Sequence, residues 1–384
     1  MRAADRASGE GIINQAAAGP RPVRVLMTVD AVGGVWRYAM DLAAGLKPYG
    51  VDFVFVGLGP RPSSSQRGEA EALGKLIWRD AQLDWLAKGP DEVAALPAML
   101  KRLVDKEAID LLHLNSPSQA CGLTIDLPTV VVSHSCVVTW MHFVRFEQQP
   151  AEWTWQKRHN RAGFDAADAV LAPSGSHAAA LEQCYGPIAG LSVVYNSTQT
   201  SAGIAQRQPF VFAAGRWWDE GKNGKVLDRV AADLSWPVKI AGSLKGPNGE
   251  RIPMRHTDHL GELPSTEIQQ LMATGGIFVS PSLYEPFGLA PLEAAYCATP
   301  LVLADIPTYR ELWDGAALFA APRDPVAFGQ ALESLIASPA LRRDMGRKAL
   351  QRAKRYSADA QAQAMLRIYQ GVRAPAELRL ALTS

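Results

Sequence analysis

The sequence has few of the residues that build metal or disulfide sites. Its four cysteines are scattered along the chain without metal-ligand spacing, as Cys121, Cys136, Cys184 and Cys297. The histidines form no HExxH or Cys/His pattern either. We therefore expect the reduced, mostly buried cysteines of a cytoplasmic protein, and no metal or other cofactor.

The sequence also lacks an excess of charge and a long apolar run. Its 39 lysines and arginines are balanced by 38 aspartates and glutamates, and a net charge of +1 gives no reason to expect nucleic-acid binding. The longest apolar stretch, residues 130–144, is interrupted by His134 and His142 and is too short and too polar to span a bilayer. Peripheral contact with a membrane surface, at its inner face, stays open.

The beginning of the chain has no apolar core of the kind that a signal peptide requires. It carries Arg2, Asp5, Arg6 and Glu10. We expect residues 1–20 to form a disordered tail.

What the sequence does contain is a regular alternation of short apolar strands and helical segments. We expect strands at 23–29, 51–57, 110–114, 129–133, 169–172 and 192–195, separated by helices at 92–106, 153–164 and 176–183. After a polar linker at 196–208 the alternation resumes, with a strand from Phe210, a helix at 224–233, and strands at 238–241, 277–280 and 301–304. This alternation predicts an α/β fold with parallel sheets covered on both faces.

The length of 384 residues and the linker predict two domains. We place an N-terminal Rossmann-like domain at 21–200 and a C-terminal one at 208–355. A last amphipathic helix at 357–372 begins at a serine cap. Two such domains would face each other across a deep cleft at the carboxyl ends of their sheets.

The stretch SPSLYEPFGLAPLEAA, residues 280–295, is the main clue to chemistry. Gly288 lets a ligand approach the backbone, and Pro291 suits the first turn of a helix. The free amides of that turn favour an anion such as a phosphate. Glu285 and Glu293 flank this position and can accept hydrogen bonds from hydroxyl groups. Phosphate beside a polyhydroxyl group is typical of a sugar nucleotide.

A second segment, AAGRWWDEGKNG, follows the first strand of the second domain. It places Arg216 and Lys222 at the carboxyl edge of that sheet, where a guanidinium and an ammonium suit a diphosphate. The alternative is a solvated loop with two ordinary surface cations.

The first domain offers a glycine turn and a histidine to the same cleft. Gly33 and Gly34 lie between the first strand and the first helix, without the GxGxxG or GxxxxGK[ST] spacing that an oxidoreductase or a P-loop would need. The turn either faces a phosphate or is a tight turn with no role in ligand binding. His134 follows a strand. It either hydrogen-bonds a sugar hydroxyl or shuttles a proton, or it is a structural histidine.

Two other patterns have competing interpretations. Two carboxylates can indicate a glycosidase, but eight helical residues between Glu285 and Glu293 would separate them by about 12 Å of rise, more than the roughly 5–10 Å that such enzymes use. An aromatic and basic segment between Trp140 and His159 either holds an acceptor sugar, touches an anionic membrane, or packs a helix pair.

From residue 23 to residue 371 the chain resembles the retaining GT-B glycosyltransferases of the family-4, or "glycosyl transferases group 1", type. The motif EPFGLAPLEA matches that family's Glu-x7-Glu motif, and the Gly-Arg pair with Lys222 matches its diphosphate-binding pair. The stretches GELPSTEIQQL and PTYRELW also fit. The resemblance implies two Rossmann-like domains and transfer of a hexosyl group from a nucleotide-diphosphate sugar to an acceptor hydroxyl.

The resemblance also implies roles for single residues. His134, Arg216, Lys222 and Glu285 would be the catalytic groups. Glu293 would hold the ribose hydroxyls and Glu285 those of the donor sugar. The remaining donor-binding positions would be Gly33, Gly34, Gly242, Leu263, Phe287, Gly288 and Leu289. The helix at 357–372 would pack back on the first domain, and the cations would take the place of a metal.

Three positions depart from the family pattern, because Ser197, Asn223 and Ala298 stand where glycine is usual. Each adds a Cβ and reduces local backbone freedom. The expected donor is a UDP-, GDP- or ADP-hexose, and the expected acceptor a glycan, a glycolipid, another lipid-linked sugar or a small molecule. The alternatives are a phosphorylase, epimerase or hydrolase that uses the same cleft, and a non-catalytic sugar-nucleotide-binding protein.

Overall fold

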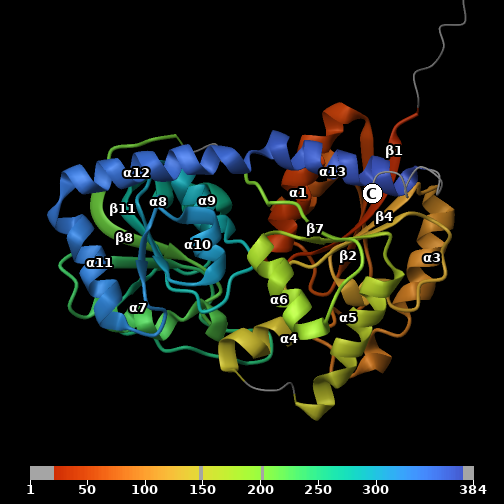
Figure 1. Ribbon diagram of the computed structural model, residues 1–384, viewed down its shortest axis with the longest axis horizontal. Coiled ribbons are helices and arrows are strands. Elements are labelled where there is room, and N and C mark those ends of the chain that lie inside the picture. The colour runs from red at the N-terminus through yellow and green to blue at the C-terminus, as the bar shows by residue number, and fades with distance from the viewer. Residues whose placement is uncertain (1–20, 147–149, 200–202, 375–384) are drawn as a thin grey trace, which may run out of the picture.

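The computed structural model describes residues 21–146, 150–199 and 203–374. It contains two parallel sheets, each with helices around it, lying side by side (Figure 1). The two Rossmann-like domains predicted from the alternation of strands and helices are therefore confirmed. Residues 1–20, expected to form a tail, lie outside the described residues, as do residues 200–202 of the expected linker.

The first domain contains a seven-stranded sheet in the order β3-β2-β1-β4-β5-β6-β7, with every pair parallel. Its strands are β1 (Val23–Asp30), β2 (Val51–Leu58), β3 (Gly74–Trp78), β4 (Leu111–Leu114), β5 (Thr129–Val132), β6 (Ala169–Ala172) and β7 (Leu191–Val193). Its helices are α1 (Gly34–Leu46), α2 (Ser64–Leu73), α3 (Leu96–Glu107), α4 (Val137–Trp140), α5 (Thr154–Ala166) and α6 (Gly175–Tyr185). The strand order reverses at β1, the position at which ligands bind in open parallel sheets.

The second domain contains six strands in the order β10-β9-β8-β11-β12-β13, again with parallel pairing. They are β8 (Gln208–Ala214), β9 (Val238–Ala241), β10 (Asp258–His259), β11 (Gly275–Ser280), β12 (Leu301–Ala304) and β13 (Leu318–Ala320). The helices are α7 (Gly224–Ala231), α8 (Ser265–Thr274), α9 (Leu289–Tyr296), α10 (Pro307–Trp313), α11 (Pro325–Ala337) and α12 (Pro339–Ala353). The last helix in the described part of the chain is α13 (Ala358–Arg373).

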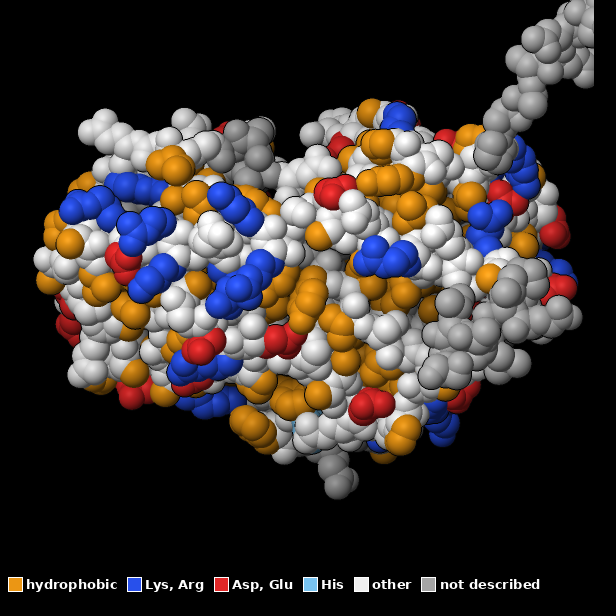
Figure 2. Space-filling view, turned by 45° about the horizontal axis from the view of Figure 1, so that its top comes forward, with side chains coloured by type: hydrophobic (Ala, Val, Ile, Leu, Met, Phe, Trp, Pro, Cys, Tyr) orange, Lys and Arg blue, Asp and Glu red, His pale blue; other side chains and the backbone are white. Residues whose placement is uncertain are grey.

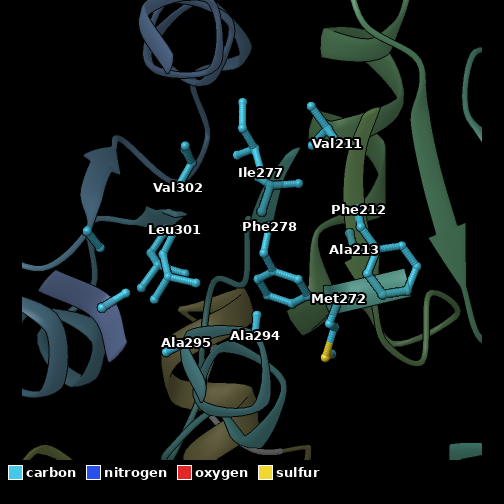
Figure 3. Close-up of a cluster of buried hydrophobic side chains, with 14 of the residues drawn as sticks. Val211, Phe212, Ala213, Met272, Ile277, Phe278, Ala294, Ala295, Leu301 and Val302 are labelled. Atoms are coloured by element: carbon cyan, nitrogen blue, oxygen red, sulfur yellow. The ribbon is translucent and has the colours of Figure 1, made fainter. Parts of the chain in front are cut away.

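Alternate residues of each strand enter the packing on opposite faces of the first sheet. In β5, Val130 and Val132 pack on one face and Val131 on the other. Such a strand is buried on both faces, and this explains why it appears in the sequence as an unbroken apolar run. Figure 3 shows the corresponding core of the second domain, where Phe278 of β11 lies between Phe212 of β8 and Ala294 of α9.

The C-terminal helix returns to the first domain. After α12 crosses the second domain, α13 lies along α1 (Figure 1). Its residues Ala362, Met365, Tyr369 and Val372 are buried in the first domain's core, and the Tyr369 hydroxyl lies 2.7 Å from Nδ1 of His113. Burying a side chain such as Met365 contributes about 1.5–3 kcal/mol, so α13 ties the two domains together.

The sequence located several elements well and missed others. The strands at 169–172, 238–241 and 301–304 have the predicted bounds. The helix predicted from residue 92 begins at Leu96, because residues 90–92 form a separate 3-10 turn. Strand β3 was missed, since its sequence GKLIW offers only a short apolar run after a glycine.

Basic side chains gather on one side of the molecule, as Figure 2 shows for the half on which α12 lies. Some of these residues have structural partners. Arg352 donates to the carbonyl oxygens of Leu312 and Asp314, and Arg342 lies over the ring of Trp236.

Candidate active site

Loops that follow the carboxyl ends of both sheets meet between the two domains. The turn after β1 carries Gly33 and Gly34. A Cβ built on Gly33 would lie 3.2 Å from a guanidinium nitrogen of Arg216, and one on Gly34 would lie 3.6 Å from Leu289. The glycine turn of the first domain therefore lies against the two donor-side segments that the sequence singled out. A larger side chain at Gly33 would crowd Arg216.

Arg216 lies in the loop that follows β8 and is only partly buried. Its guanidinium is 3.5 Å from Asp219 and 5.4 Å from the centre of the Trp218 ring. Asp30, at the end of β1, also faces it: burial raises the pKa of the Asp30 carboxyl, while the Val32 amide and the charge of Arg216 oppose that rise. Arg216 is thus a cation placed between a carboxylate of its own loop and one of the first domain.

Lys222 ends the same loop, and its ammonium forms an ion pair with Glu285. The side chains are 22% and 16% exposed, so the pair is partly shielded from water but open on one side. Glu285 lies in the loop between β11 and α9. The pair therefore brings together the two segments, residues 216–222 and 280–295, that the sequence predicted to share a ligand.

Helix α9 begins beside this pair. Gly288 precedes it with φ 92° and ψ 75°, in the left-handed region where glycine is favoured, and its missing Cβ leaves room for the ring of Tyr309. The helix starts at Leu289, so Glu285 precedes it rather than lying eight helical residues below Glu293. The amides of its first turn lack partners within the helix, as at every helix N-terminus, and such amides favour an anion.

Glu293 lies on α9 and is partly buried. Burial raises the pKa of its carboxyl to about 7, and the charge of Asp41 adds to the rise, while a hydrogen bond from Thr198 and the charge of Arg37 oppose it. The Thr198 hydroxyl donates to Glu293 over 3.3 Å. Near neutral pH this carboxyl is therefore close to its midpoint, and it can both accept and donate a hydrogen bond.

His134 follows β5 in the first domain and is held in one orientation. The side-chain NH2 of Asn115 donates to the Thr28 carbonyl over 2.6 Å, so its oxygen must accept from Nε2 of His134, at 2.8 Å. The proton of the neutral ring is thus on Nε2, and Nδ1 carries a lone pair. Burial, with a smaller contribution from nearby His113 and His177, lowers the pKa of His134 to about 3. A neutral ring of this tautomer can accept a hydrogen bond from a hydroxyl group at Nδ1.

The other predicted donor positions, Gly242, Phe287 and Leu263, have partners within the second domain. Gly242 has φ 115°, and both its amide and its carbonyl are bonded, to Gly261 and His259. Phe287 is buried against Tyr356, and Leu263 packs on the second domain's core. The Phe287 and Leu263 side chains therefore support the loops, and the polar backbone groups of Gly242 are already paired within the second domain.

Two of the departures from glycine lie where the backbone is left-handed. Asn223 has φ 58° and Ala298 has φ 56°. The Asn223 side chain donates to the carbonyls of Pro281 and Pro322, over 2.9 and 2.6 Å, which joins its loop to the segment that carries Glu285. Ser197 instead donates to Gln361 of α13, over 2.7 Å. Asn223 and Ser197 therefore gain hydrogen bonds that a glycine could not make.

Sequence reasoning missed the partners that orient these groups: Thr198, Asp41, Asn115, Asp219 and Tyr284. Only Asp41 carried a signal in the sequence, as an acidic residue among the apolar residues of α1. In the structure its side chain is 2% exposed. Its carboxylate pairs with Arg37 at 2.8 Å. The others are ordinary polar residues in loops, and no spacing rule marks them.

The aromatic and basic segment divides between packing and exposure. Trp155 is buried, whereas Phe146 is 76% exposed and has φ 55°. Trp140 donates to Asp219 over 2.9 Å, across to the second domain. The prediction of simple helix packing therefore holds for Trp155 but not for Trp140, which contacts the loop of Arg216 and Lys222.

Within residues 21–146, 150–199 and 203–374, no three His, Cys, Asp or Glu side chains are grouped in a way that could hold a metal ion. None of the helices in these ranges is both long and apolar enough to cross a membrane.

The sequence matches two family models, one after the other. Residues 32–202 match the model of glycosyltransferase family 4, and residues 199–352 match that of the glycosyl transferases group 1. Glycogen synthase of Mycobacterium tuberculosis is 25% identical over 366 residues, which cover 84% of this chain and 86% of the relative.

Solved structures have the same fold. A sucrose-phosphate synthase from Thermosynechococcus elongatus has a TM-score of 0.75 at 17% identity, over 91% of this chain and 98% of the other. An Anabaena protein in complex with UDP and glucose has a TM-score of 0.69 at 16% identity, over 91% and 99%. At these identities the likeness establishes the GT-B architecture and nothing finer.

Proposed function

Since this chain belongs to the GT-B glycosyltransferases of the group 1, family-4 type, we propose that it transfers a hexosyl group from a nucleotide-diphosphate sugar to an acceptor hydroxyl, with retention at the anomeric carbon. The observation that carries the proposal is the meeting of Arg216, the Lys222–Glu285 pair and the start of α9 against the glycine turn of the first domain. Two cations and a helix N-terminus form a site for a diphosphate, and carboxylates beside it suit sugar hydroxyls.

The proposed reaction places its negative charge where the cations lie. The bond between the anomeric carbon and the diphosphate oxygen breaks, and the acceptor oxygen forms the new bond from the same face. The acceptor proton passes to the departing diphosphate oxygen. Arg216, Lys222 and the first amides of α9 stabilise that charge, so the chemistry calls for neither a protein nucleophile nor a metal.

The remaining groups hold the donor. Glu285 accepts hydrogen bonds from hydroxyl groups of the transferred sugar, and Glu293 accepts them from the ribose hydroxyls. Gly33 and Gly34 let the backbone of the first domain approach the diphosphate. His134 accepts a hydrogen bond from a sugar hydroxyl at Nδ1. Its low pKa argues against a role as a cationic acid near neutral pH.

The donor and acceptor are proposed as classes. A relative that matches most of the chain is a glycogen synthase, and a structural neighbour was solved with UDP and glucose. These support a UDP-, GDP- or ADP-hexose as donor and a carbohydrate hydroxyl as acceptor, on a free glycan, a glycolipid or a small molecule. We place the reaction in the cytoplasm, with peripheral contact at the inner membrane face if the acceptor is lipid-linked.

The test begins with the donor. Thermal unfolding should be measured with a panel of nucleotide sugars, where a ligand at 100 times its dissociation constant adds about 2.7 kcal/mol of stability. The stabilising donor is then incubated with glycan and glycolipid acceptors, and the anomeric configuration of the product is read by proton NMR. An inverted product contradicts retention. A free sugar, a sugar phosphate or an epimerised donor as the sole product indicates a hydrolase, phosphorylase or epimerase. Donor binding with no turnover indicates a non-catalytic protein.

Lys222→Ala tests the diphosphate site directly. Loss of one charge-assisted contact should cost about 1.5–3 kcal/mol of transition-state stabilisation, and so lower kcat/KM roughly 10- to 150-fold. The matched control is Lys225→Ala, which removes an exposed lysine three residues along the same chain segment. Equal kinetics for Lys222→Ala and the wild type, in folded protein, would contradict the assignment.

A further inference from the structure

A short segment of the first domain, residues 137–146, reaches across to the second domain. It consists of α4 and the π-helical turn Met141–Arg145. The indole N–H of Trp140 donates to Asp219 over 2.9 Å, and Arg145 pairs with Glu220 at 3.0 Å. Arg323 of the second domain donates to the Val144 carbonyl over 2.7 Å. π-Helical turns are rare and occur frequently at functional sites.

The same segment contacts the loop that carries Glu285. The Tyr284 hydroxyl donates to Thr139 over 2.9 Å and lies 3.0 Å from Nδ1 of His177. The ring of Phe143 stacks on that of Tyr284, with centres 5.6 Å apart and planes within 8° of parallel. Segment 137–146 therefore touches both donor-side loops, each within three residues of a charged group of the site.

Asp219 is the point at which these contacts join. One carboxylate oxygen accepts both the Trp140 indole N–H and the Gly221 amide, each over 2.9 Å, and the other lies 3.5 Å from Arg216. The Gly221 carbonyl accepts the amide of Leu283 over 2.8 Å. The orientation of Asp219 thus affects Arg216 directly and the Glu285 loop through Gly221.

Gly221 leaves just enough room for this arrangement. A Cβ at this position would lie 2.9 Å from the indole nitrogen of Trp140 and 3.4 Å from Val144. The backbone there does not have a positive φ, so conformation alone does not require glycine. The glycine is explained by the close approach of the indole.

We propose that Trp140 is a positioning residue that holds the Arg216–Lys222 loop in its diphosphate-binding arrangement by docking on Asp219 and Gly221. The proposal rests on the proposed function, since it concerns the same site. A motion that separates the two domains would break the Trp140 contact and release the loop. The loop is therefore ordered for the diphosphate when the first domain, which would bring the acceptor, is in place.

Trp140→Phe removes the indole N–H and keeps an aromatic ring. The matched control is Trp78→Phe, which removes an indole hydrogen bond of 3.1 Å to the Gly59 carbonyl inside the first domain. Amide hydrogen exchange of the peptide covering residues 215–223 is measured in the full chain without any donor. We expect exchange in this peptide to quicken several-fold in Trp140→Phe and to stay at the wild-type rate in Trp78→Phe. Unchanged exchange in Trp140→Phe overturns the proposal.

Gly221→Ala tests the same contact between Trp140 and the Arg216–Lys222 loop without removing a polar group. The added methyl should displace the indole, and the 215–223 peptide should again exchange faster than in the wild type. With the donor and acceptor found above, both variants should lose about tenfold or more in kcat while KM for the donor changes less, because the charged groups remain. A rise in KM with an unchanged kcat also overturns the proposal. If no donor is turned over, the proposed function fails while the exchange experiment still decides whether Trp140 orders the loop.

Discussion

At the scale of single residues, burial determines the charge of the groups in the site. The pKa of His134 falls to about 3 and that of Glu293 rises to about 7, in both cases mainly because a buried charge loses its hydration. Both shifts favour the neutral form. The positive groups of the site are Arg216 and Lys222, whose side chains are 41% and 22% exposed.

Glu293→Gln should change how stability depends on pH. The carboxyl has an ordinary pKa of 4.5 and one of about 7 in the fold, so the folded state retains a proton that the unfolded state releases. This raised pKa makes the free energy of unfolding fall as pH rises from about 4.5 to about 7. Gln cannot ionise, so the variant should gain about 1–3 kcal/mol relative to the wild type across that window.

Denaturant unfolding of both proteins between pH 4 and pH 8 checks this prediction. The measured quantity is the difference in their free energy of unfolding, in which the titration of other groups cancels. Parallel curves for the two proteins would show that Glu293 ionises normally in the fold.

At the scale of elements, the loop after β8 is shaped by close backbone contacts. A Cβ on Gly242, which follows β9, would lie 2.0 Å from the carbonyl oxygen of Gly215, the residue before Arg216. The Gly242 amide also donates to Gly261 over 2.7 Å. The ends of β8 and β9 are thus packed backbone to backbone, and this fixes where the diphosphate loop begins.

Gly242→Ala should therefore be strongly destabilising. It combines left-handed strain at φ 115° with a clash against backbone, together about 2–5 kcal/mol. Gly249→Ala is the matched control, since Gly249 has φ 90° but no atom within 4 Å of the added Cβ, and it should cost about 1–2 kcal/mol. Denaturant midpoints measure both. Equal losses would mean that the Gly215 contact is of no consequence.

At the scale of the whole molecule, the two domains are joined by contacts far apart in sequence. Glu311 on α10 accepts the amides of Gly175 and Ser176 at the start of α6, over 2.9 and 2.6 Å, and the hydroxyls of Ser176 and Tyr195. Its charge suits the helix N-terminus. This carboxylate and helix α13 connect the domains at two separate places.

Glu311→Ala should loosen that connection. Removal of a charged acceptor of four hydrogen bonds should cost at least about 2 kcal/mol, and calorimetry should show separate unfolding of the two domains. Glu333→Ala is the control, because Glu333 accepts an amide and a hydroxyl from Ser235 within the second domain only. It should lower stability without separating the transitions. A single unchanged transition in Glu311→Ala would contradict the prediction.

Local pattern was enough to predict the two sheets and the segments that meet between them. Apolar runs of four to eight residues flanked by polar turns predicted β6, β9 and β12 with their observed bounds. Arg216, Lys222 and Glu285 were found because each stands in a glycine-rich loop directly after a strand. The arrangement of these residues along the chain determined that their loops meet, since parallel strands bring their carboxyl ends to one edge.

Only the tertiary structure decided what state these groups are in. The pKa of Glu293 depends on Asp41, His134 is oriented by Asn115, and Asp219 is held by Trp140, all across long stretches of chain. Desolvation, charge and hydrogen-bond direction come from neighbours that packing brings together, and no local spacing records them. The sequence by itself determined which loops meet between the two domains, and the packing of the two domains determined how their side chains are charged and held.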